Sequence, residues 1–360
     1  MVKVSDIAAH LGVSRLTVSA VLNNREKQVG VAKATADRVR LAAQAMGYQR
    51  NHHAMAIKTG FNPVVGCLVS ELQMEWTSRT LSGLLGAMRK SNYLTKITEV
   101  SGHDAEQDAL SQFMQHRVAG IFCCNFNPES ASARSLEKVV ASYSVPLVFA
   151  FSRQDLAGVC VESDDAMGIQ QAVNHIWSLG HRRIAFISGE QVREEAFVRT
   201  LSGLGGTLYP NFLVQSFWSN DAAEAAATQL LAKKARPTAI ICANDALAAT
   251  VLRTAVRLGF RVPNDLSVTG FSASQLSAFT NPPLTSVSQP FEEIGARCGE
   301  ILMKLIGASK GRTLSPSQSL HAMPTHLVIR ESTARPPQEA SSKKRKLVVD
   351  GLRLKNYTRG

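Results

Sequence analysis

The first 22 residues contain the pattern that most restricts how this chain can fold. Apolar residues recur at helical spacing from Val4 to Leu11, and Gly12 then supplies a residue suited to a left-handed turn. Ser14 has the side chain of an N-cap for a second helix from about Arg15 to Leu22. Two short helices joined by such a tight turn form a helix-turn-helix, whose second helix typically lies in the major groove of DNA.

The second predicted helix has one face that packs inward and one that faces outward. The inward face consists of Val18, Val21 and Leu22. The outward face includes Arg15, Leu16 and Ala20, with the first two at the N-terminal end, where base edges are read. Arginine suits the O6 and N7 atoms of guanine, and leucine suits the methyl group of thymine. An ordinary solvated surface remains the alternative for both residues.

A third helix at 33–46 would complete a small head at 1–48, with 24–31 as a polar loop. Residues 49–62 are predicted to link the head to the rest, with two helical turns that are too short to be stable alone. Residues 1–60 carry nine Lys or Arg against three Asp or Glu, and 334–360 carry eight against two, whereas 61–333 is neutral. A basic head on a neutral body is typical of a nucleic-acid-binding protein.

Beyond residue 63, short apolar segments alternate with amphipathic ones. Strands are predicted at 64–69, 94–100, 118–123, 146–151, 183–188, 238–243 and 266–271. Helices are predicted at 78–90, 104–116, 167–179, 222–232 and 246–258. Strands that are apolar throughout and alternate with helices indicate parallel sheets covered on both faces, so the expected class is α/β. Ligands of such folds bind at the C-terminal ends of the strands.

No catalytic or metal-binding pattern accompanies this core. The sequence has no Gly-x-Ser-x-Gly, Walker loop or His-Glu-x-x-His, so we expect a protein that is not an enzyme and has no cofactor or metal. The six cysteines lack zinc-ligand spacing and lie mostly in apolar surroundings, which favours buried thiols. No signal peptide or transmembrane run is visible, and we expect a cytoplasmic protein with no membrane partner.

Several ordered motifs resemble the lactose-repressor (LacI/GalR) family of bacterial transcription regulators across residues 3–333. The motifs are 13–23, Gly47-Tyr48 followed by Asn51, 179–184, 242–245, 262–271, 283–290 and 327–333. The resemblance implies a homodimer with a helix-turn-helix head, a hinge helix and a core of two lobes like the periplasmic sugar-binding proteins. It places 62–161 and 291–320 in the DNA-proximal lobe, and 162–290 and 321–333 in the distal lobe.

The resemblance also assigns two sets of candidate residues. The DNA-binding set, for a near-palindromic operator, is Ser5, Ser14, Arg15, Leu16, Thr17, Ser19, Asn23, Tyr48, Asn51, Ala54, Ile57 and Lys58. Ile57 stands where the family places a leucine that wedges a base step, and Ser14 has an N-cap role as its alternative. The effector set lines the cleft between the lobes: Trp76, Asn125, Phe151, Arg153, Asp164, Arg193, Asn244, Ser272 and Gln289.

Departures from the family pattern bear on the effector. Ser152 and Ser272 replace two of the aspartates that the family uses for sugar hydroxyls, whereas Arg153 and Arg193 remain. Because two negative charges are lost, the cleft is expected to favour an anionic sugar derivative, which arginine can bind with two hydrogen bonds. Asp164 still offers one carboxylate, although a helix-capping role is its alternative. Residues 334–360 are an addition to the family pattern, and their basic run is expected to be a solvated, disordered tail.

Two other classes of protein are alternatives to a DNA-binding regulator. A periplasmic-type solute-binding protein shares the two-lobed core, but it needs an export signal and no helix-turn-helix. A sugar-modifying enzyme needs a catalytic constellation that the sequence lacks. The sequence therefore predicts an effector-controlled transcription regulator, in this family usually a repressor.

Overall fold

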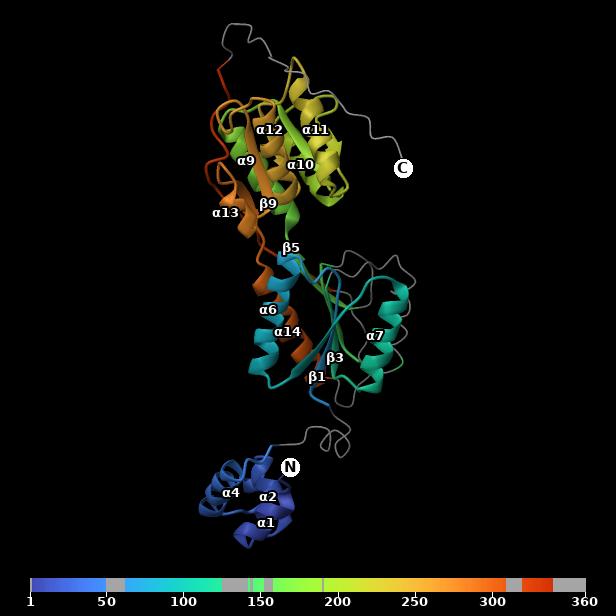
Figure 1. Ribbon diagram of the computed structural model, residues 1–360, viewed down its shortest axis with the longest axis vertical. Coiled ribbons are helices and arrows are strands. Elements are labelled where there is room, and N and C mark those ends of the chain that lie inside the picture. The colour runs from blue at the N-terminus through green and yellow to red at the C-terminus, as the bar shows by residue number, and fades with distance from the viewer. Residues whose placement is uncertain are drawn as a thin grey trace, which may run out of the picture.

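The computed structural model describes residues 2–49, 62–124, 142, 145–151, 158–189, 191–308 and 319–338. These residues form a helical head and two α/β lobes (Figure 1). Each lobe contains its own six-stranded sheet with helices packed on it. The architecture confirms the predicted class, an all-α head followed by a two-lobed core with parallel sheets.

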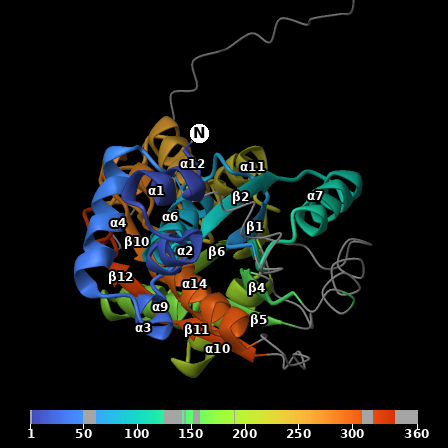
Figure 2. The same ribbon diagram turned by 90° about the horizontal axis from the view of Figure 1, so that it is seen from below.

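The head is a cluster of short helices around a small apolar core. Its helices are α1 (Val4–Leu11), α2 (Arg15–Leu22), α3 (Glu26–Val29) and α4 (Lys33–Ala45), and Figure 2 looks onto α1, α2 and α4 from below. Ile7, Val18, Val21 and Val39 are buried between them. The predicted polar loop at 24–31 is wrong in part, because α3 forms within it.

The first lobe has a parallel sheet with the strand order β11-β5-β4-β3-β1-β2. The strands are β1 (Val64–Val69), β2 (Leu94–Glu99), β3 (Gly120–Cys124), β4 (Leu147–Ala150), β5 (Val159–Ser163) and β11 (Ser319–Met323). The helices are α6 (Glu75–Lys90), α7 (His103–Gln115) and α14 (Phe291–Ala308). The central strands β1, β3 and β4 are almost wholly buried, as their continuous apolar sequences predict.

The second lobe has the order β12-β10-β9-β8-β6-β7, in which only β12 is antiparallel among the described strands. The strands are β6 (Ile184–Ser188), β7 (Leu213–Gln215), β8 (Ala239–Cys242), β9 (Ser267–Ser272), β10 (Thr285–Ser288) and β12 (His326–Val328). The helices are α9 (Asp165–Ser178), α10 (Gln191–Gly203), α11 (Asn220–Ala232), α12 (Asp245–Arg257) and α13 (Gln275–Phe279).

The chain passes between the lobes at three places in the described sequence. The second passage, β10 to α14, lies at the predicted boundary near 290, whereas the first, β5 to α9, lies beyond the predicted boundary at 161, since β5 continues to Ser163. The third was predicted before residue 321 and instead follows Met323, because β11 pairs with β5 in the first lobe through that residue. Each passage leaves the C-terminal end of a strand. β5 and β10 lead into the N-terminal ends of α9 and α14, and β11 leads into β12.

In the first lobe, α6 and α14 cross with their backbones in contact. A Cβ atom on Gly83 would lie 1.9 Å from the carbonyl oxygen of Glu292, and one on Gly295 would lie 1.8 Å from that of Thr80. Neither position has room for a side chain, so the two helices pack more closely than larger residues would allow. This packing joins the start of α6 and the start of α14 into one unit beside the junction.

The six cysteines are free thiols, as predicted, and all but Cys160 are buried. Burial raises the pKa of Cys67 to about 12 and raises that of Cys298 as well, so these thiols are protonated and unreactive at neutral pH. Among the described helices, none combines the length and the apolar character needed to span a membrane.

Candidate DNA-binding and effector-binding sites

The turn between α1 and α2 has the geometry that the sequence predicts. Gly12 adopts a left-handed conformation with φ 65° and ends α1. Ser14 caps α2, because its hydroxyl accepts a hydrogen bond from the backbone N–H of Thr17 at 3.0 Å. Because Val18 and Val21 are buried, the rotation of α2 about its own axis is fixed, and the opposite face of the helix is exposed to solvent. The two helices therefore form a helix-turn-helix with an exposed second helix.

The exposed face of α2 begins with Arg15 and Leu16. Both are exposed, and Leu16 keeps 68% of its surface accessible. Ala20 was predicted to face outward and does not, since it is only 3% exposed. The chain after α2 folds back over this position, where the N–H of Arg25 donates to the carbonyl of Ala20.

The other head candidates make local hydrogen bonds around the same helix. The Ser14 and Thr17 hydroxyls are 2.8 Å apart, the side-chain amide of Asn23 donates to the carbonyl of Ser19, and Ser5 donates to Asp6. Tyr48 is half-buried against the head core. Four candidates, Asn51, Ala54, Ile57 and Lys58, lie outside the described residues.

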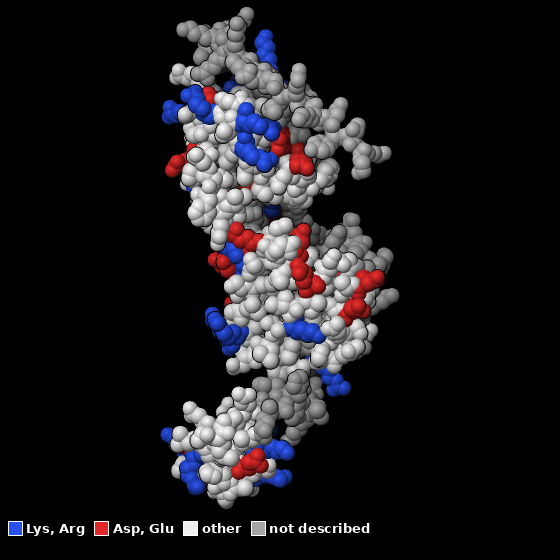
Figure 3. All heavy atoms as spheres, in the orientation of Figure 1, with Lys and Arg blue, Asp and Glu red and all other residues white. Residues whose placement is uncertain are grey.

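The described part of the head is basic. Residues 2–49 hold seven Lys or Arg and three Asp or Glu, and basic side chains predominate on the face of the head seen in Figure 3. Asp6 is one of the three acidic residues. Its carboxyl group accepts a hydrogen bond from the backbone N–H of Lys3, and this bond lowers the pKa of the carboxyl group. An excess of positive charge around an exposed helix favours a polyanionic partner.

The effector candidates of the second lobe gather at the ends of its strands. Ser272 is the last residue of β9, Gln289 follows β10, Asn244 follows β8, and Arg193 lies in the first turn of the helix after β6. Because these strands are parallel, their C-terminal ends share one edge of the sheet, which faces the first lobe. The topology therefore brings together residues that are up to 96 positions apart in the chain.

Hydrogen bonds link several of these residues into one network. The Ser272 hydroxyl donates to Gln289 Oε1 at 3.2 Å, and Gln289 Nε2 donates to the hydroxyl of Ser163 at 2.6 Å. Ser163 in turn donates to Asp165 Oδ1 at 2.5 Å. Since Ser163 ends β5 and Gln289 precedes α14, this network joins two of the three passages between the lobes.

Arg193 is held at the centre of the network by Asp165. Its Nε and Nη2 atoms lie 2.9 and 2.8 Å from Asp165 Oδ2, and an Nη1–H donates to the carbonyl of Ala243. The guanidinium group also lies 4.0 Å from the ring centroid of Phe271. Arg193 is 8% exposed and Asp165 is 7% exposed, so the ion pair is almost completely removed from water.

Two other candidates of this set cap helices. Asp164 Oδ1 accepts the N–H of Met167 at 2.8 Å at the start of α9, and Asn244 Oδ1 accepts the N–H of Leu247 at 2.8 Å at the start of α12. The capping role that was an alternative for Asp164 is thus present in the structure. Asp245, by contrast, is buried beside Gly270, and burial raises the pKa of its carboxyl group despite three hydrogen bonds from serines.

The first lobe contributes aromatic rings to the same junction. Trp76, near the start of α6, lies edge-on to Phe151, which follows β4, with ring centroids 5.5 Å apart. Phe151 also contacts the ring of Phe291 at the start of α14, at 5.9 Å. The remaining candidates of this lobe, Asn125 and Arg153, lie outside the described residues.

The structure adds residues that the sequence pattern missed. Trp218 follows β7 and lies over Gly189, where a Cβ atom would come within 2.4 Å of its ring. Its ring centroid is 5.5 Å from the guanidinium of Arg193. An aromatic pair after a short strand, Phe217-Trp218, and a glycine directly after β6 were the available signals. The ion-pair role of Asp165 had no local signal.

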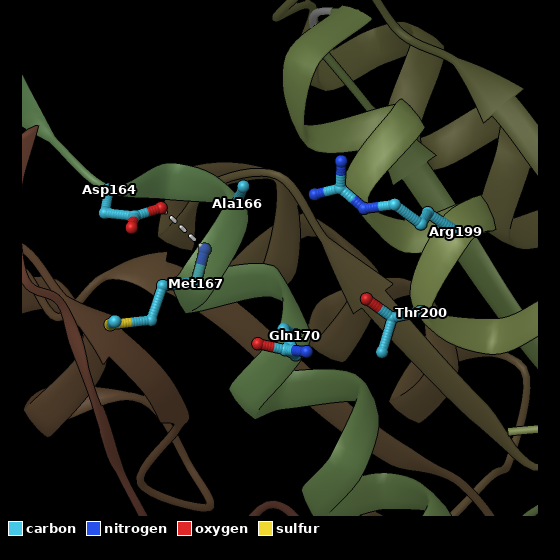
Figure 4. Close-up of a pocket in the computed structure, with 6 residues that line it drawn as sticks. All are labelled: Asp164, Ala166, Met167, Gln170, Arg199 and Thr200. Carbon is cyan, nitrogen blue, oxygen red and sulfur yellow. Dashed lines mark hydrogen bonds between the residues drawn. The ribbon is translucent and has the colours of Figure 1, made fainter. Parts of the chain in front are cut away.

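A separate hollow of about 230 Å³ lies between α9 and α10 (Figure 4). Its lining consists of Asp164, Ala166, Met167, Gln170, Arg199 and Thr200. In Figure 4 the side chain of Arg199 extends from α10 toward the space beside α9, while Asp164 stays at the start of α9. The hollow reaches the junction between the lobes at Asp164, and neither of the described aromatic candidates, Trp76 and Phe151, lines it.

Comparisons with known proteins agree with this geometry. Residues 3–51 match the family described as bacterial regulatory proteins, lacI family, and 173–333 match the periplasmic binding protein-like domain. The transcriptional regulator MalR of Streptomyces coelicolor is 33% identical over 351 residues, covering 94% of this chain and 98% of the relative. The repressor CytR of Escherichia coli is 27% identical, covering 91% of this chain and 95% of the relative.

Solved structures show the same fold. The lac repressor dimer bound to operator and the anti-inducer ONPF aligns with a TM-score of 0.76 and 23% identity, over 92% of this chain and 99% of that one. The complex of the transcriptional regulator CelR with cellobiose aligns with a TM-score of 0.65 and 25% identity, over 92% of this chain and 100% of that one.

The head and the core together define a DNA-binding transcriptional regulator with an effector-binding domain. The chain belongs to the LacI family of bacterial regulatory proteins. A free solute-binding protein, the alternative from the sequence, is not favoured, because residues 3–51 match the regulator head and the full-length relatives are regulators.

Proposed function

We propose that this protein is a homodimeric repressor that binds a near-palindromic operator and responds to a small polar effector at the junction of its two lobes. The observation that carries the proposal is the presence, in one chain, of an exposed recognition helix and a two-lobed core in which two of the three interlobe passages meet in one polar network. A ligand that contacts Gln289 or Ser272 would act directly on the segments that join the lobes.

In the DNA complex, Arg15 and Leu16 read the bases. Both project from the N-terminal turn of α2, where no other described segment covers them. Arg15 supplies a bidentate contact to guanine and Leu16 an apolar contact to a thymine methyl. Ser5, Ser14, Thr17, Ser19, Asn23 and Tyr48 supply phosphate contacts that position the helix. The hinge set, Asn51, Ala54, Ile57 and Lys58, would order in the minor groove, with Ile57 as the wedge.

Two exposed apolar groups support the homodimer. Leu276 and Phe279 protrude from α13, and Phe279 is 84% exposed. In the first lobe Leu94 and Ile97 are exposed on β2, which lies at one edge of the described sheet. Exposed apolar side chains on an unpaired edge and on a short helix fit contacts with a second copy of the chain, and a dimer presents two heads to two half-sites.

For the effector, the proposal is a sugar or sugar derivative. Aromatic rings from Trp76 and Phe151, together with the polar groups of Asp164, Asn244, Ser272 and Gln289, suit a ring with several hydroxyl groups. The sequence favours an anionic ligand because Arg153 and Arg193 are retained while two aspartates are replaced by serines. Arg193 is paired with Asp165, so that expectation now depends on Arg153, outside the described residues.

The proposed functional units follow the predicted ranges: a head at 1–48, a hinge at 49–62, a core at 63–333 and a tail at 334–360. At the last boundary Ala334 still contacts the core, because its N–H and carbonyl both bond to the Ser267 hydroxyl. We place the protein in the cytoplasm, where DNA and a reducing environment for its free thiols are found, and we assign it no catalytic step.

The experiment that tests this function is a titration of DNA from upstream of the protein's own gene, followed by fluorescence anisotropy. The proposal expects saturable binding that is competed by the unlabelled site and not by an unrelated duplex. Ligands found by thermal shift are then added. A thermal-shift ligand that leaves DNA affinity unchanged would contradict effector control, and binding no tighter to this DNA than to the unrelated duplex would contradict operator recognition there.

A further inference from the structure

We propose that the end of the second lobe farthest from the first lobe is a second DNA-binding surface, which holds a duplex through its phosphates without reading its sequence. This surface, the distal face, consists of residues 179–183, 233–238, 259–266 and 331–338. It goes beyond the proposed function, because operator binding requires only the heads. One consequence rests on the proposed function: with its heads on an operator, the molecule would join two segments of DNA.

The topology of the second lobe brings the four segments of the distal face together. Three of them lead into the N-terminal ends of β6, β8 and β9, which are neighbours in the parallel sheet. The fourth lies against them, because the N–H of Ala334 donates to the Ser267 hydroxyl and its carbonyl oxygen is 2.8 Å from Nε2 of His181. Since the C-terminal ends of the strands face the first lobe, these segments lie at the opposite end of the second lobe (Figure 1).

The distal face is strongly basic. Its four segments contain two acidic residues, Asp265 and Glu331, and seven basic ones: Arg182, Arg183, Lys233, Lys234, Arg236, Arg261 and Arg335. Basic side chains also predominate at this end of the molecule in Figure 3. Residues 61–333 are neutral as a whole, so the positive charge is gathered at one end of the core and balanced by negative charge elsewhere in it. A surface of this kind attracts polyanions.

Contacts between the segments make the basic residues one continuous surface. Arg183 Nε donates to the carbonyl of Arg236 at 3.1 Å, and Arg236 Nη1 donates to the carbonyl of Asp265 at 3.1 Å. Arg182 also donates to backbone carbonyl groups. A carbonyl holds a guanidinium group in place and leaves its charge intact. The carboxylate of Asp265 pairs with Arg261 at 2.9 Å, and it cannot balance the other cations as well.

The helix ends at the distal face account for only part of this charge. The helices α9, α11 and α12 each end directly before one of its loops, and cations are favourable at helix C-termini. Each C-terminus is equivalent to roughly half a negative charge, so three of them offset about 1.5 of the positive charges. Seven basic residues against two acidic ones leave an excess of five, which the helix ends do not cancel.

The absence of exposed apolar groups favours DNA over other anionic partners. No large apolar side chain in these four described segments is exposed. Protein interfaces centre on buried aromatic and apolar side chains, and proteins that lie on membranes insert apolar side chains into them. A duplex needs neither, because its phosphates bind distributed Lys and Arg directly. A molecule whose heads hold DNA also has other segments of that DNA at high local concentration.

The distal face and the connection to the head lie at opposite ends of the core. The chain enters the core at the N-terminal end of β1, on the side of the first lobe away from the second (Figure 1). A duplex at the distal face is therefore a different segment from the one that the heads hold. Residues 339–360, which follow the distal face in the chain, add seven Lys or Arg and two Asp or Glu.

Photocrosslinking tests the surface without knowledge of the operator. The full-length protein carries p-benzoylphenylalanine in place of Gln338, an exposed neutral residue of the distal face, and is irradiated with a random-sequence duplex of about 40 base pairs. The control carries it in place of Gln170, an exposed glutamine on α9 outside the distal face. The Gln338 position should crosslink to DNA at least about fivefold more than the Gln170 position. Equal crosslinking would overturn the proposal.

Two charge variants, each made in the Gln338 crosslinking protein, show which residues hold the duplex. Lys234→Gln with Arg335→Gln removes two exposed cations of the distal face, and Arg199→Gln with Arg253→Gln removes two exposed cations from helices of the same lobe. Crosslinking should fall at least about threefold in the first variant and stay unchanged in the second. Because all four side chains are exposed, both variants should melt at the parent's temperature. Undiminished crosslinking in the first variant would show that the distal face does not hold the DNA.

Capture of a second duplex tests the joining of two DNA segments. Beads carry a duplex that the protein selects from a random library, and the bound parent should retain a labelled, unrelated duplex. For Lys234→Gln with Arg335→Gln, the dependence of log retention on log salt should be shallower by about 1–2. A parent that binds the selected duplex but retains no second one would overturn the joining of segments. If no duplex is selected, the proposed function fails, and crosslinking at Gln338 still decides whether the distal face binds DNA.

Anionic vesicles provide the competing outcome. Vesicles of phosphatidylcholine with phosphatidylserine are sedimented with the parent and with Lys234→Gln, Arg335→Gln, in the salt used for crosslinking. The proposal expects little sedimentation of either protein. Sedimentation of the parent that is lost in the variant, without crosslinking of DNA at Gln338, would identify a membrane-binding surface and overturn the proposal.

Discussion

The side chain of Glu75 in the first lobe accepts hydrogen bonds from the backbone N–H of Gln275 in the second lobe, at 3.0 Å through Oε2 and 3.2 Å through Oε1. Glu75 begins α6 and Gln275 begins α13, and Figure 1 shows these helices on the same side of the molecule at the junction. A carboxylate at the start of α13 is favourable because the N-terminal N–H groups of a helix have no partners within it.

The Glu75–Gln275 contact is expected to hold the lobes in the arrangement seen here. Glu75→Ala should broaden the interlobe distance distribution, measured by double electron–electron resonance between labels on the two lobes. Because the contact is partly exposed, its loss should cost only about 1 kcal/mol. Glu71→Gln, an exposed change near the same helix, is the control. Identical interlobe distance distributions for the parent and Glu75→Ala would show that this contact does not hold the lobes together.

Gly83 and Gly86 provide a matched pair on α6. Gly83→Ala should destabilise the protein by about 1–3 kcal/mol, because the new methyl group meets the backbone of α14 at Glu292. Gly86→Ala meets nothing within 4 Å and should stabilise by about 0.5–1 kcal/mol through helix propensity. Urea denaturation measures both. Equal effects of the two substitutions would mean that α6 and α14 do not pack as described.

His181 should make stability depend on pH. Burial lowers the pKa of its imidazole, assisted by the nearby charges of His175 and Arg182, although the carbonyl of Ala334 partly opposes the shift. The unfolded chain therefore takes up a proton near the ordinary pKa of about 6.5, where the folded chain does not, so the free energy of unfolding falls as pH falls through that value.

This dependence has a direct measurement. The free energy of unfolding should fall between roughly pH 7.5 and roughly pH 5.5 because of His181. His181→Gln should reduce the slope but not abolish it, since burial also lowers the pKa of His175. A slope in His181→Gln as steep as in the parent would show that His181 does not remain neutral in the folded protein.

Arg15 should contribute specificity as well as charge. Arg15→Ala should weaken binding to the best site by about 1–3 kcal/mol and relax the preference at one base pair in each half-site. Arg38→Ala removes the same charge from an exposed position on α4 and should weaken binding to all duplexes alike. If the two variants have the same base preferences as the parent, Arg15 does not read a base.

Local patterns in the sequence predicted most of the fold. The left-handed Gly12, the cap at Ser14 and the bounds of β1 at 64–69 appear in the structure as the sequence indicates, because each depends on neighbouring residues. The strands β5, β7, β10 and β11 were missed, since each is short and mixes polar with apolar residues instead of forming a continuous apolar run. Ala20 was misplaced because its burial depends on the chain that returns after α2.

The candidate effector site shows where such prediction stops. The resemblance to a family supplied the positions of Arg193, Ser272 and Gln289, and parallel strands bring them to one edge. The partner of Arg193 could not be predicted in this way. Asp165 lies 28 positions earlier, and the ion pair depends on how α9 and α10 pack, which no spacing in the sequence encodes.

The central claim is that this protein is a dimeric regulator that reads a symmetric DNA site through α2. Selection of duplexes from a random library by the full-length protein tests it most directly. The account predicts enrichment of a near-palindromic site with two equivalent half-sites, and a changed base preference at one position of each half-site for Arg15→Ala. Enrichment of no sequence, or of a single asymmetric half-site, would contradict it.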